Sequence, residues 1–592
     1  MSKILRFSTL SFFLLLFLTG CTSSRNSERT CTVIFEDHPS LYFPQQIYNV
    51  TPQDDLSISI GLPHGERISS ANYEDYTLSS KTGESENYDY YTLTLHKIRY
   101  SALVRLTTAP VYTTAYYGAD DLEEVITVSE ESPHLFFHTL PYEQQFERDG
   151  YVPIGWNTAP DGSGTAIGFG SRFDRRNLQH LDLYAEWVPC TPADLFDYRQ
   201  EGNEIIITGY HGSGDLVIPA FIDGCLVTAI AEHAFESITA DCLVLPWSIK
   251  TVAAGAFHQI TVKDFYFFDC IEHIPEEAFE NYQISHLHIL ASKDPVYSGS
   301  YFDTLADKID YLASLDGKRK IVLLCGSSAR FGFESPLLEN AYPDYHVVNL
   351  GVFAYSNMLP QAMLALSYME EGDILLSSPE FDAISQQFCG HTDLDKETFC
   401  MMESNYDMFA RLDCRQFTSV FSAFENYNQS RTRMSARSYQ ESPSYYDEDG
   451  QKLPSPSYNR WGDYIVYREN NLSEKNFGIK RAFYHPDYFT EMDIQGINAV
   501  YDSFAQKGIT VYFTYSPRSK NSISDDSTPA SMKMLEDLLN SKLHATIISS
   551  IDDSLWEPLY FYGTDNHLST EGANLHTQKV IEDLRPYLEE LP

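Results

Sequence analysis

Alternating apolar and polar residues mark the first part of the chain as β structure. Between residues 31 and 146 they alternate in short runs such as Tyr91–Leu95 and Ala102–Leu106. This period of two is typical of β-strands with one buried face. Glycine, asparagine, aspartate and proline separate the runs. We therefore expect a β domain over residues 31–146.

A second pattern is an internal repeat. The dipeptide Ala-Phe starts at Ala234, Ala256 and Ala278, a constant interval of 22 residues. Apolar residues precede each copy at matching positions. A period near 22 is the signature of a leucine-rich solenoid, in which successive repeats stack to bury a common core. The sequence leaves open whether three or four such repeats form a binding surface or a spacer.

From about Tyr301 the pattern changes to α/β. Apolar residues at helical spacing predict a helix over Tyr301–Leu315, which Asp316 and Gly317 end. Helical segments then alternate with strand candidates, which predicts a parallel sheet covered on both faces. The five predicted strands are Ile321–Cys325, Tyr345–Leu350, Asp373–Ser377, Ile509–Tyr515 and His544–Ser549. The predicted helices between them include Pro360–Met369, Asp493–Lys507 and Ala530–Lys542, and the last helix covers Thr570–Leu584. A polar insert at 383–490 is too long for a plain connection and predicts a lid or subdomain.

The N-terminus has the features of a secretory signal. Lys3 and Arg6 precede an apolar stretch that is too short to span a bilayer comfortably. The stretch ends in Leu-Thr-Gly-Cys at Cys21, which resembles the lipobox of bacterial lipoproteins. That resemblance implies cleavage before Cys21, lipid attachment to its thiol, and a protein anchored to the membrane outside the cytoplasm. Residues 22–30 would form a short tether. The alternative is an ordinary signal peptide with a chance cysteine.

The net charge of the chain argues against one class of partner. It is −42, from 41 basic and 83 acidic residues, and an anionic chain of this kind disfavours nucleic-acid binding.

The cysteines give little sign of a disulfide framework. Of ten cysteines, nine remain after Cys21, without a repeating pattern. Cys389, His391, Cys400 and Cys414 form the tightest group, so zinc is an alternative there. Free thiols or one disulfide fit better because no Cys-x2-Cys pair is present. We expect no metal and no cofactor; the oligomeric state stays open.

Three segments place candidate chemistry at the carboxyl ends of the predicted strands, where open α/β sheets bind ligands. The first strand ends in a Gly-Ser-Ser turn that contains Ser328, and the second ends at Gly351. Asp565 and His567 lie just before the last predicted helix. A serine, a histidine that takes its proton and an aspartate that orients the histidine form the minimum set for acyl transfer.

This order resembles the SGNH (GDSL-like) hydrolase superfamily over about residues 318–592. Ser328 matches the serine of its first block, Gly351 matches the second block, and Asp565 with His567 matches the last. The resemblance implies a three-layer α/β domain at 300–592 and ester chemistry without a metal. Members are esterases, lipases, deacetylases and O-acetyltransferases.

The chain departs from the family in three places. Ser327 stands where the first block has aspartate, and one residue separates Asp565 from His567 where most members have two. The third strand ends with Ser378 and Glu380, where the family has an asparagine that stabilises the oxyanion. Removing one such donor costs on the order of a hundred- to a thousandfold in rate. Ser378 could donate a hydrogen bond instead, whereas an ionised Glu380 could not.

Two further resemblances concern the modules before this domain. Residues 147–188 contain Gly155-Trp156, Asp161–Thr165 and Leu183–Trp187, and resemble one Listeria-Bacteroides repeat, a small β module of bacterial surface proteins. Residues 189–295 resemble BspA-like leucine-rich repeats. Both imply display at a cell surface.

The resulting hypothesis is a lipid-anchored surface protein with a serine esterase or O-acyltransferase domain. Its substrates would be small acyl esters, acetyl above all, of an envelope or host glycan. Ser328 would attack the acyl carbon, His567 would act as base, and Asp565 would orient His567. The amides of Ser328 and Gly351 would hold the oxyanion.

Two alternatives remain. One is a non-catalytic adhesion or binding protein with a degenerate SGNH-like domain, favoured if Glu380 fills the pocket. The other is an acyltransferase that depends on a partner during envelope assembly.

His576, inside the last predicted helix, is expected at the surface.

Overall fold

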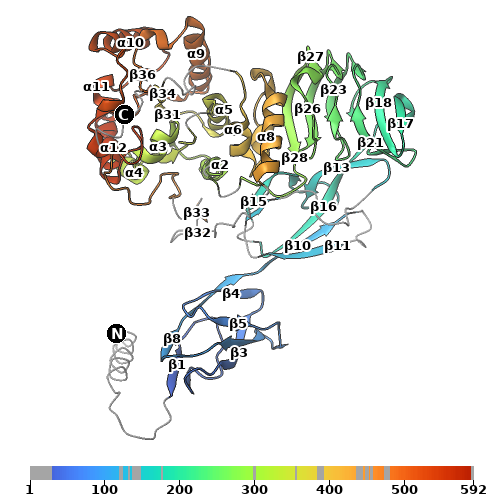
Figure 1. Cartoon of the computed structure of the whole chain (residues 1–592), viewed down its shortest axis with the longest axis vertical. Helices are drawn as coiled ribbons and strands as arrows, with labels where there is room; N and C mark the ends of the chain where they lie inside the picture. Colours follow the sequence, from blue (N-terminus) through green and yellow to red (C-terminus); the bar gives the residue numbers. More distant parts are fainter. Residues whose placement is uncertain are drawn as a thin grey trace. The chain divides into compact units, whose positions relative to one another are not determined.

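The computed structural model describes most of the chain after residue 29 (Figure 1). The described ranges are 30–118, 125–130, 134–136, 148–174, 178–297, 300, 302–353, 356–382, 392–434, 445–446, 452–453, 458–472 and 481–588. Cys21, Cys389 and His391 lie outside them. Two compact units are present: the first holds residues 1–114, 127–133 and 176–181, and the second holds 115–126, 134–175 and 182–592. No helix within the described ranges is long and apolar enough to span a membrane.

The first unit is built of short strands, as the alternating pattern predicts. Its longest pairing is antiparallel, between β3 (Leu56–Pro63) and β7 (Tyr88–Leu95). Ile60 and Leu93 are fully buried on the inner face. The other strands are β1 (Cys31–Phe35), β2 (Ile47–Val50), β4 (Glu66–Ala71), β5 (Tyr76–Leu78), β6 (Gly83–Glu84), β8 (Ala102–Val104) and β9 (Leu106–Pro110). β10 (Tyr112–Tyr117) and β11 (Val125–Glu130) cross the boundary between the two units.

The predicted aromatic module forms an antiparallel sheet around Trp156. β13 (Tyr151–Asn157) pairs with β14 (Ala166–Gly168) and with β16 (His180–Pro189). The Trp156 side chain is almost fully buried and meets the rings of Tyr116 and Phe169 edge to face. β12 (His134–Phe136) pairs with β15 (Arg172–Asp174). Large aromatic rings thus fill the core of a module too small to bury many aliphatic side chains.

In residues 193–291, the repeat region, strands of successive repeats pair in parallel at a step of 22 residues, whereas β17–β18 and β20–β21 pair antiparallel. Thr239 of β23 aligns with Thr261 of β26, which aligns with Gln283 of β28. The repeat also aligns Phe235, Phe257 and Phe279, whose rings stack at centroid distances of 5.1 and 5.0 Å. The strands are β17 (Phe196–Glu201), β18 (Glu204–Tyr210), β19 (Leu216–Val217), β20 (Phe221–Ile222), β21 (Cys225–Ile230), β22 (Phe235–Glu236), β23 (Thr239–Val244), β24 (Thr251–Val252), β25 (Phe257–His258), β26 (Thr261–Phe268), β27 (Phe279–Glu280) and β28 (Gln283–Leu290).

The described first part of the insert, 392–434, closes the end of this stack. Helix α8 (Val420–Met434) lies beside the last strands (Figure 1). Its Phe421 ring stacks on Phe279 at 3.8 Å and 11°, so it continues the aromatic ladder of the repeats. Stacked repeats need a cap because the last repeat otherwise exposes its apolar face. This part of the predicted lid or subdomain is therefore an end cap for the repeat region.

A buried ion cluster also joins the insert to the repeats. Arg431 of α8 lies 2.6 Å from Asp269, which follows β26, and 2.7 Å from Glu403. All three side chains are at most 1% exposed. The hydroxyl of Tyr427 donates to Glu403 at 2.9 Å. The cluster ties α8 to the repeat region by charge as well as by ring stacking.

The carboxy-terminal part contains the predicted parallel sheet. All five predicted strands are present, and they are ordered β30-β29-β31-β34-β36. Their bounds are β29 (Lys320–Leu324), β30 (His346–Asn349), β31 (Ile374–Ser377), β34 (Thr510–Phe513) and β36 (Thr546–Ile547). The helices are α2 (Thr304–Ser314), α3 (Ser327–Gly332), α4 (Ser335–Ala341), α5 (Met358–Tyr368), α6 (Lys396–Met402), α7 (Asp407–Ala410), α9 (Glu491–Gln506), α10 (Pro529–Lys542), α11 (Ile551–Ser554) and α12 (Thr570–Leu588). Short strands β32 (Tyr445–Tyr446), β33 (Lys452–Leu453), β35 (Arg518–Ser519) and β37 (Leu555–Trp556) lie outside this sheet.

Both faces of the sheet are covered, because alternate residues of each strand point to opposite sides. Ile321 and Leu323 of β29 belong to a cluster with residues of α3, α4 and α12. Val322 and Leu324 belong to a different cluster, with residues of α2, α5, α9 and α10. The near-continuous apolar strands of the sequence therefore form a sheet that is buried on both sides.

Candidate active site

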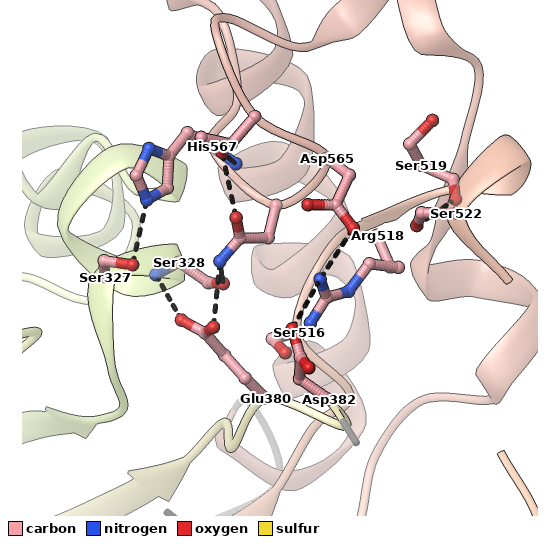
Figure 2. Close-up of polar contacts among 12 residues, drawn as sticks. Ser327, Ser328, Glu380, Asp382, Ser516, Arg518, Ser519, Ser522, Asp565 and His567 are labelled. Carbon is pink, nitrogen blue, oxygen red and sulfur yellow. Dashed lines mark hydrogen bonds and ion pairs between the residues drawn. The ribbon is translucent and has the colours of Figure 1, made fainter. Parts of the chain in front are cut away.

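The candidate site lies at the carboxyl ends of β29 and β31, where the chain leaves the sheet (Figure 2). Gly326 follows β29 in an extended conformation and precedes α3, whose first residues are Ser327 and Ser328. Glu380 lies three residues after the end of β31. The loop before α12 brings Asp565 and His567 to the same place. The structure thus assembles the segments that the sequence singles out.

The serine that meets the histidine is Ser327. Its Oγ lies 2.8 Å from Nε2 of His567, a hydrogen-bond distance. The motif match predicts this contact for Ser328, but consecutive residues at a helix start point about 100° apart, so the two serine side chains meet different residues of the loop before α12. Ser327 faces His567, whereas the Oγ of Ser328 accepts from the Asn566 amide, and both serines are buried. The serine in contact with His567 is therefore one residue earlier in the chain than the serine that the motif match singles out.

His567 is an uncharged imidazole in this site. Burial, together with the positive charge of Arg330, lowers its pKa to about 3. The imidazole is therefore neutral near pH 7, and Nε2 can take the proton of the Ser327 hydroxyl. The ring stacks on Phe331 of α3 at 4.1 Å and 22°, which holds its orientation. The guanidinium group of Arg468 lies over the Phe331 ring, 5.8 Å from the ring centroid.

Glu380 accepts hydrogen bonds from two N–H donors that lie beside Ser327 and Ser328. Its side chain is 1% exposed, and one carboxyl oxygen accepts the backbone N–H of Ser328 at 2.7 Å. The other accepts the side-chain amide of Asn566 at 2.8 Å. The same amide donates to Ser328 Oγ at 3.2 Å. Glu380 therefore points into the site and takes up two N–H groups that could otherwise stabilise an oxyanion.

Asp565 has a different partner from the one expected. Its carboxylate pairs with Arg518 at 3.0 Å, and no hydrogen bond joins it to His567 among the described residues. Arg518 follows β34 in β35, is 1% exposed and also lies 3.7 Å from Asp382. The Asp565 charge still acts on the imidazole through space, where it raises the His567 pKa against the dominant effects. The arrangement is a serine–histidine pair with an aspartate–arginine pair beside it.

Gly351 and Ser378 were expected to face the oxyanion. The Gly351 N–H instead donates to the side chain of Asn349 at 2.9 Å. A side chain at position 351 would come within 2.6 Å of the Arg330 backbone nitrogen, so the glycine serves close packing against α3. Ser378 is buried beside the Cys325 thiol. The structure brings neither group to Ser327 as a donor.

Three residues of the site escaped the sequence analysis as functional groups: Ser327, Asn566 and Arg518. Asn566 stands between Asp565 and His567 of the matched motif, and this position was the sequence signal that could have identified it.

The prediction for His576 was wrong. It is 3% exposed, contacts the Gly332 carbonyl at 2.8 Å and packs against Phe333, because α12 turns this face toward α3.

The described residues contain no group of three or more side chains arranged to hold a metal ion. Cys400 and Cys414 of the predicted cysteine group are buried and unpaired, and burial raises both thiol pKa values to about 12. All eight cysteines in the described part of the chain are free thiols. Such protonated thiols are poor metal ligands.

Comparison with known proteins gives no assignment. No protein-family model matches this chain, and no curated protein matches it.

Proposed function

We propose that the carboxy-terminal domain is an SGNH-like serine acyl hydrolase or O-acyltransferase with Ser327 as nucleophile and His567 as base. The 2.8 Å contact between Ser327 Oγ and His567 Nε2 carries this proposal. It supports the chemistry because a neutral imidazole in hydrogen-bond reach of a hydroxyl is the minimum for activating that hydroxyl. The position of the pair, at the carboxyl ends of a parallel sheet, agrees with it.

In the proposed reaction, Ser327 Oγ attacks the ester carbonyl carbon while its proton moves to His567 Nε2. The tetrahedral intermediate collapses, the bond to the alcohol oxygen breaks, and the imidazolium returns the proton to the leaving alcohol. Water or an acceptor hydroxyl then attacks the acyl-serine, again with His567 as base, and releases Ser327. The Ser328 N–H and the Asn566 amide are the donors that we propose for the oxyanion.

A polar cavity supports a glycan as acyl donor or acceptor; its lining residue Arg468 donates to the carbonyl of Leu568, the residue after His567. It has a volume of about 690 Å³ and is lined by the segment 467–470, Glu334 and the first turns of α12. The Tyr467 ring at its edge is 77% exposed. An open aromatic ring beside amides and carboxylates can stack on a sugar ring while the polar groups bind hydroxyls.

Tyr467→Ala is expected to raise the KM for a partly O-acetylated oligosaccharide about tenfold, roughly 1.4 kcal/mol, with little change in the hydrolysis of p-nitrophenyl acetate. The removed ring would contact the sugar and not the reacting ester. Steady-state kinetics on both substrates test this. Tyr100→Ala, at a ring that is 67% exposed in the first unit, is the matched control. Equal effects of both variants would rule out a glycan contact by Tyr467.

The remaining modules fit a protein displayed at a bacterial surface. We propose lipid attachment at Cys21, a surface β module at 147–188 and a short BspA-like leucine-rich solenoid at 189–295. The cap formed by Phe421 and the ion pairs of Arg431 support a spacer role for the repeats, because they join the repeat region firmly to the domain that carries the site.

Covalent labelling tests the proposed chemistry. The soluble chain without its first 29 residues should react with a fluorophosphonate and gain the mass of one adduct, as measured by intact mass spectrometry. His567→Ala should label at least about a hundredfold more slowly, because the hydroxyl loses its base. Labelling should persist at pH 5, because His567 stays neutral above its pKa of about 3. A folded wild-type protein that never labels would contradict the proposal.

Two observations favour a second candidate, a non-catalytic surface binding protein. Glu380 holds the candidate oxyanion donors, and Asp565 pairs with Arg518 instead of His567. Both features are expected of a domain that keeps its fold and has lost its chemistry. A folded protein without labelling at any pH would favour this second function.

A further inference from the structure

The carboxylate of Glu380 has the chemistry of the species that the site would have to stabilise. A tetrahedral oxyanion and a carboxylate oxygen both carry negative charge and both accept N–H hydrogen bonds. Glu380 accepts two such bonds, from the Ser328 backbone and the Asn566 amide, at 2.7 and 2.8 Å. These donors cannot serve a substrate at the same time, because each N–H is already directed at Glu380.

We propose that Glu380 is an internal ligand of the oxyanion donors and gates acyl transfer. The site is closed while the Glu380 carboxylate holds the Ser328 N–H and the Asn566 amide, and it opens when Glu380 is protonated or displaced. This inference rests on the proposed function, since a gate matters only if Ser327 reacts. It makes Glu380 a regulatory residue and accounts for an acidic side chain in place of the family's asparagine.

The groups around Glu380 give its ionised carboxylate little stabilisation. Arg518 is the cation that faces it, and it is shared with Asp565 and Asp382. The buried Cys325 thiol also lies close to the carboxylate. His567, on the adjoining loop, carries no charge near neutral pH. The positive charge of Arg518 is thus shared among the carboxylates of Glu380, Asp382 and Asp565.

The direction of the pH dependence follows from two groups. Burial raises the pKa of Glu380, against the opposing effects of Arg518 and the Ser328 N–H. As the pH falls toward that raised pKa, Glu380 takes up a proton and its hold on the two N–H groups weakens. His567 remains neutral until the pH approaches 3. The open, competent form is therefore favoured at acidic pH.

The fluorophosphonate labelling rate of the wild-type chain between pH 8 and pH 4 tests the gate. In this reaction Ser327 Oγ bonds to phosphorus, fluoride leaves, and the serine proton goes to His567. The expected rate rises as the pH falls, by up to tenfold for each pH unit above the Glu380 pKa, since one proton is taken up. Glu380→Gln should label at the same rate at all these pH values, and at pH 8 at least tenfold faster than the wild type.

Two controls keep the test decisive. Glu371→Gln removes an exposed carboxylate just beyond α5 and should retain the wild-type profile. Glu380→Ala removes the carboxylate without placing a second amide opposite Asn566, and covers the case in which the glutamine variant fails to fold. Equal, pH-independent labelling of the wild type and Glu380→Gln would overturn the gate alone. Absence of labelling in every folded variant at every pH would overturn the proposed function, and the gate with it.

Discussion

Ser327→Ala is expected to lower the rate of fluorophosphonate labelling and of ester cleavage by at least about a thousandfold, because it removes the oxygen that attacks. Ser328→Ala is expected to change both rates by less than about tenfold. Ser328 contributes its backbone N–H, which the substitution keeps, and its Oγ only accepts a bond from Asn566. The two neighbouring serines thus differ because Ser327 alone contacts His567.

Peptide mapping of the labelled wild-type chain supplies the direct measurement, and the adduct is expected on Ser327. Circular dichroism of both alanine variants checks that neither has unfolded. An adduct on Ser328, or a Ser328→Ala variant as inactive as Ser327→Ala, would contradict this assignment. It would restore the role that the motif match predicts for Ser328.

Arg431→Met is expected to destabilise the second unit by about 3–5 kcal/mol. The substitution keeps much of the side-chain length but leaves Asp269 and Glu403 buried without their cation. Breaking a buried ion pair by removing one partner has a large cost, because the remaining charge stays desolvated. Denaturant unfolding, followed by tryptophan fluorescence, measures the loss.

Arg415→Met is the matched control for this substitution. Arg415 pairs with Asp413 at 2.7 Å in the same insert, but its side chain is 54% exposed. An exposed pair contributes about 0–1 kcal/mol, so the control should unfold close to the wild type. Equal losses for the two variants would contradict the view that the ion cluster at α8 holds the cap on the repeats. Since the chain has two units, their unfolding transitions have to be separated before the free energies are compared.

The α8 cap also explains why the insert was hard to interpret from its sequence. Its polar composition and length predict a lid or subdomain, and nothing local ties it to residues 130 or more positions earlier in the chain. Phe421 is the exception in hindsight, because its ring continues the series Phe235, Phe257 and Phe279. That relation depends on tertiary contacts and has no period in the sequence.

Local pattern was enough to predict the five strands of the carboxy-terminal sheet and the step of the repeats. The 22-residue spacing predicts the register in which Thr239, Thr261 and Gln283 align, because every repeat must place the same side chain in the same layer. Apolar runs bounded by glycine and polar residues predict the five parallel strands, because a strand buried on both faces needs apolar residues at every position. The same reasoning placed the serine turn and the Asp-x-His loop at one edge of the sheet.

Only the tertiary structure decided what the side chains at that edge contact. The choice between Ser327 and Ser328 depends on the rotation of α3 about its axis, and a change of one residue turns it by about 100°. The partner of Asp565 is Arg518, and Glu380 meets donors from two distant segments. These contacts and the one between Ser327 and His567 join residues 47 to 240 positions apart, so no local pattern encodes them. The sequence determined which segments reach the site, and long-range packing determined which of their side chains meet there and how they pair.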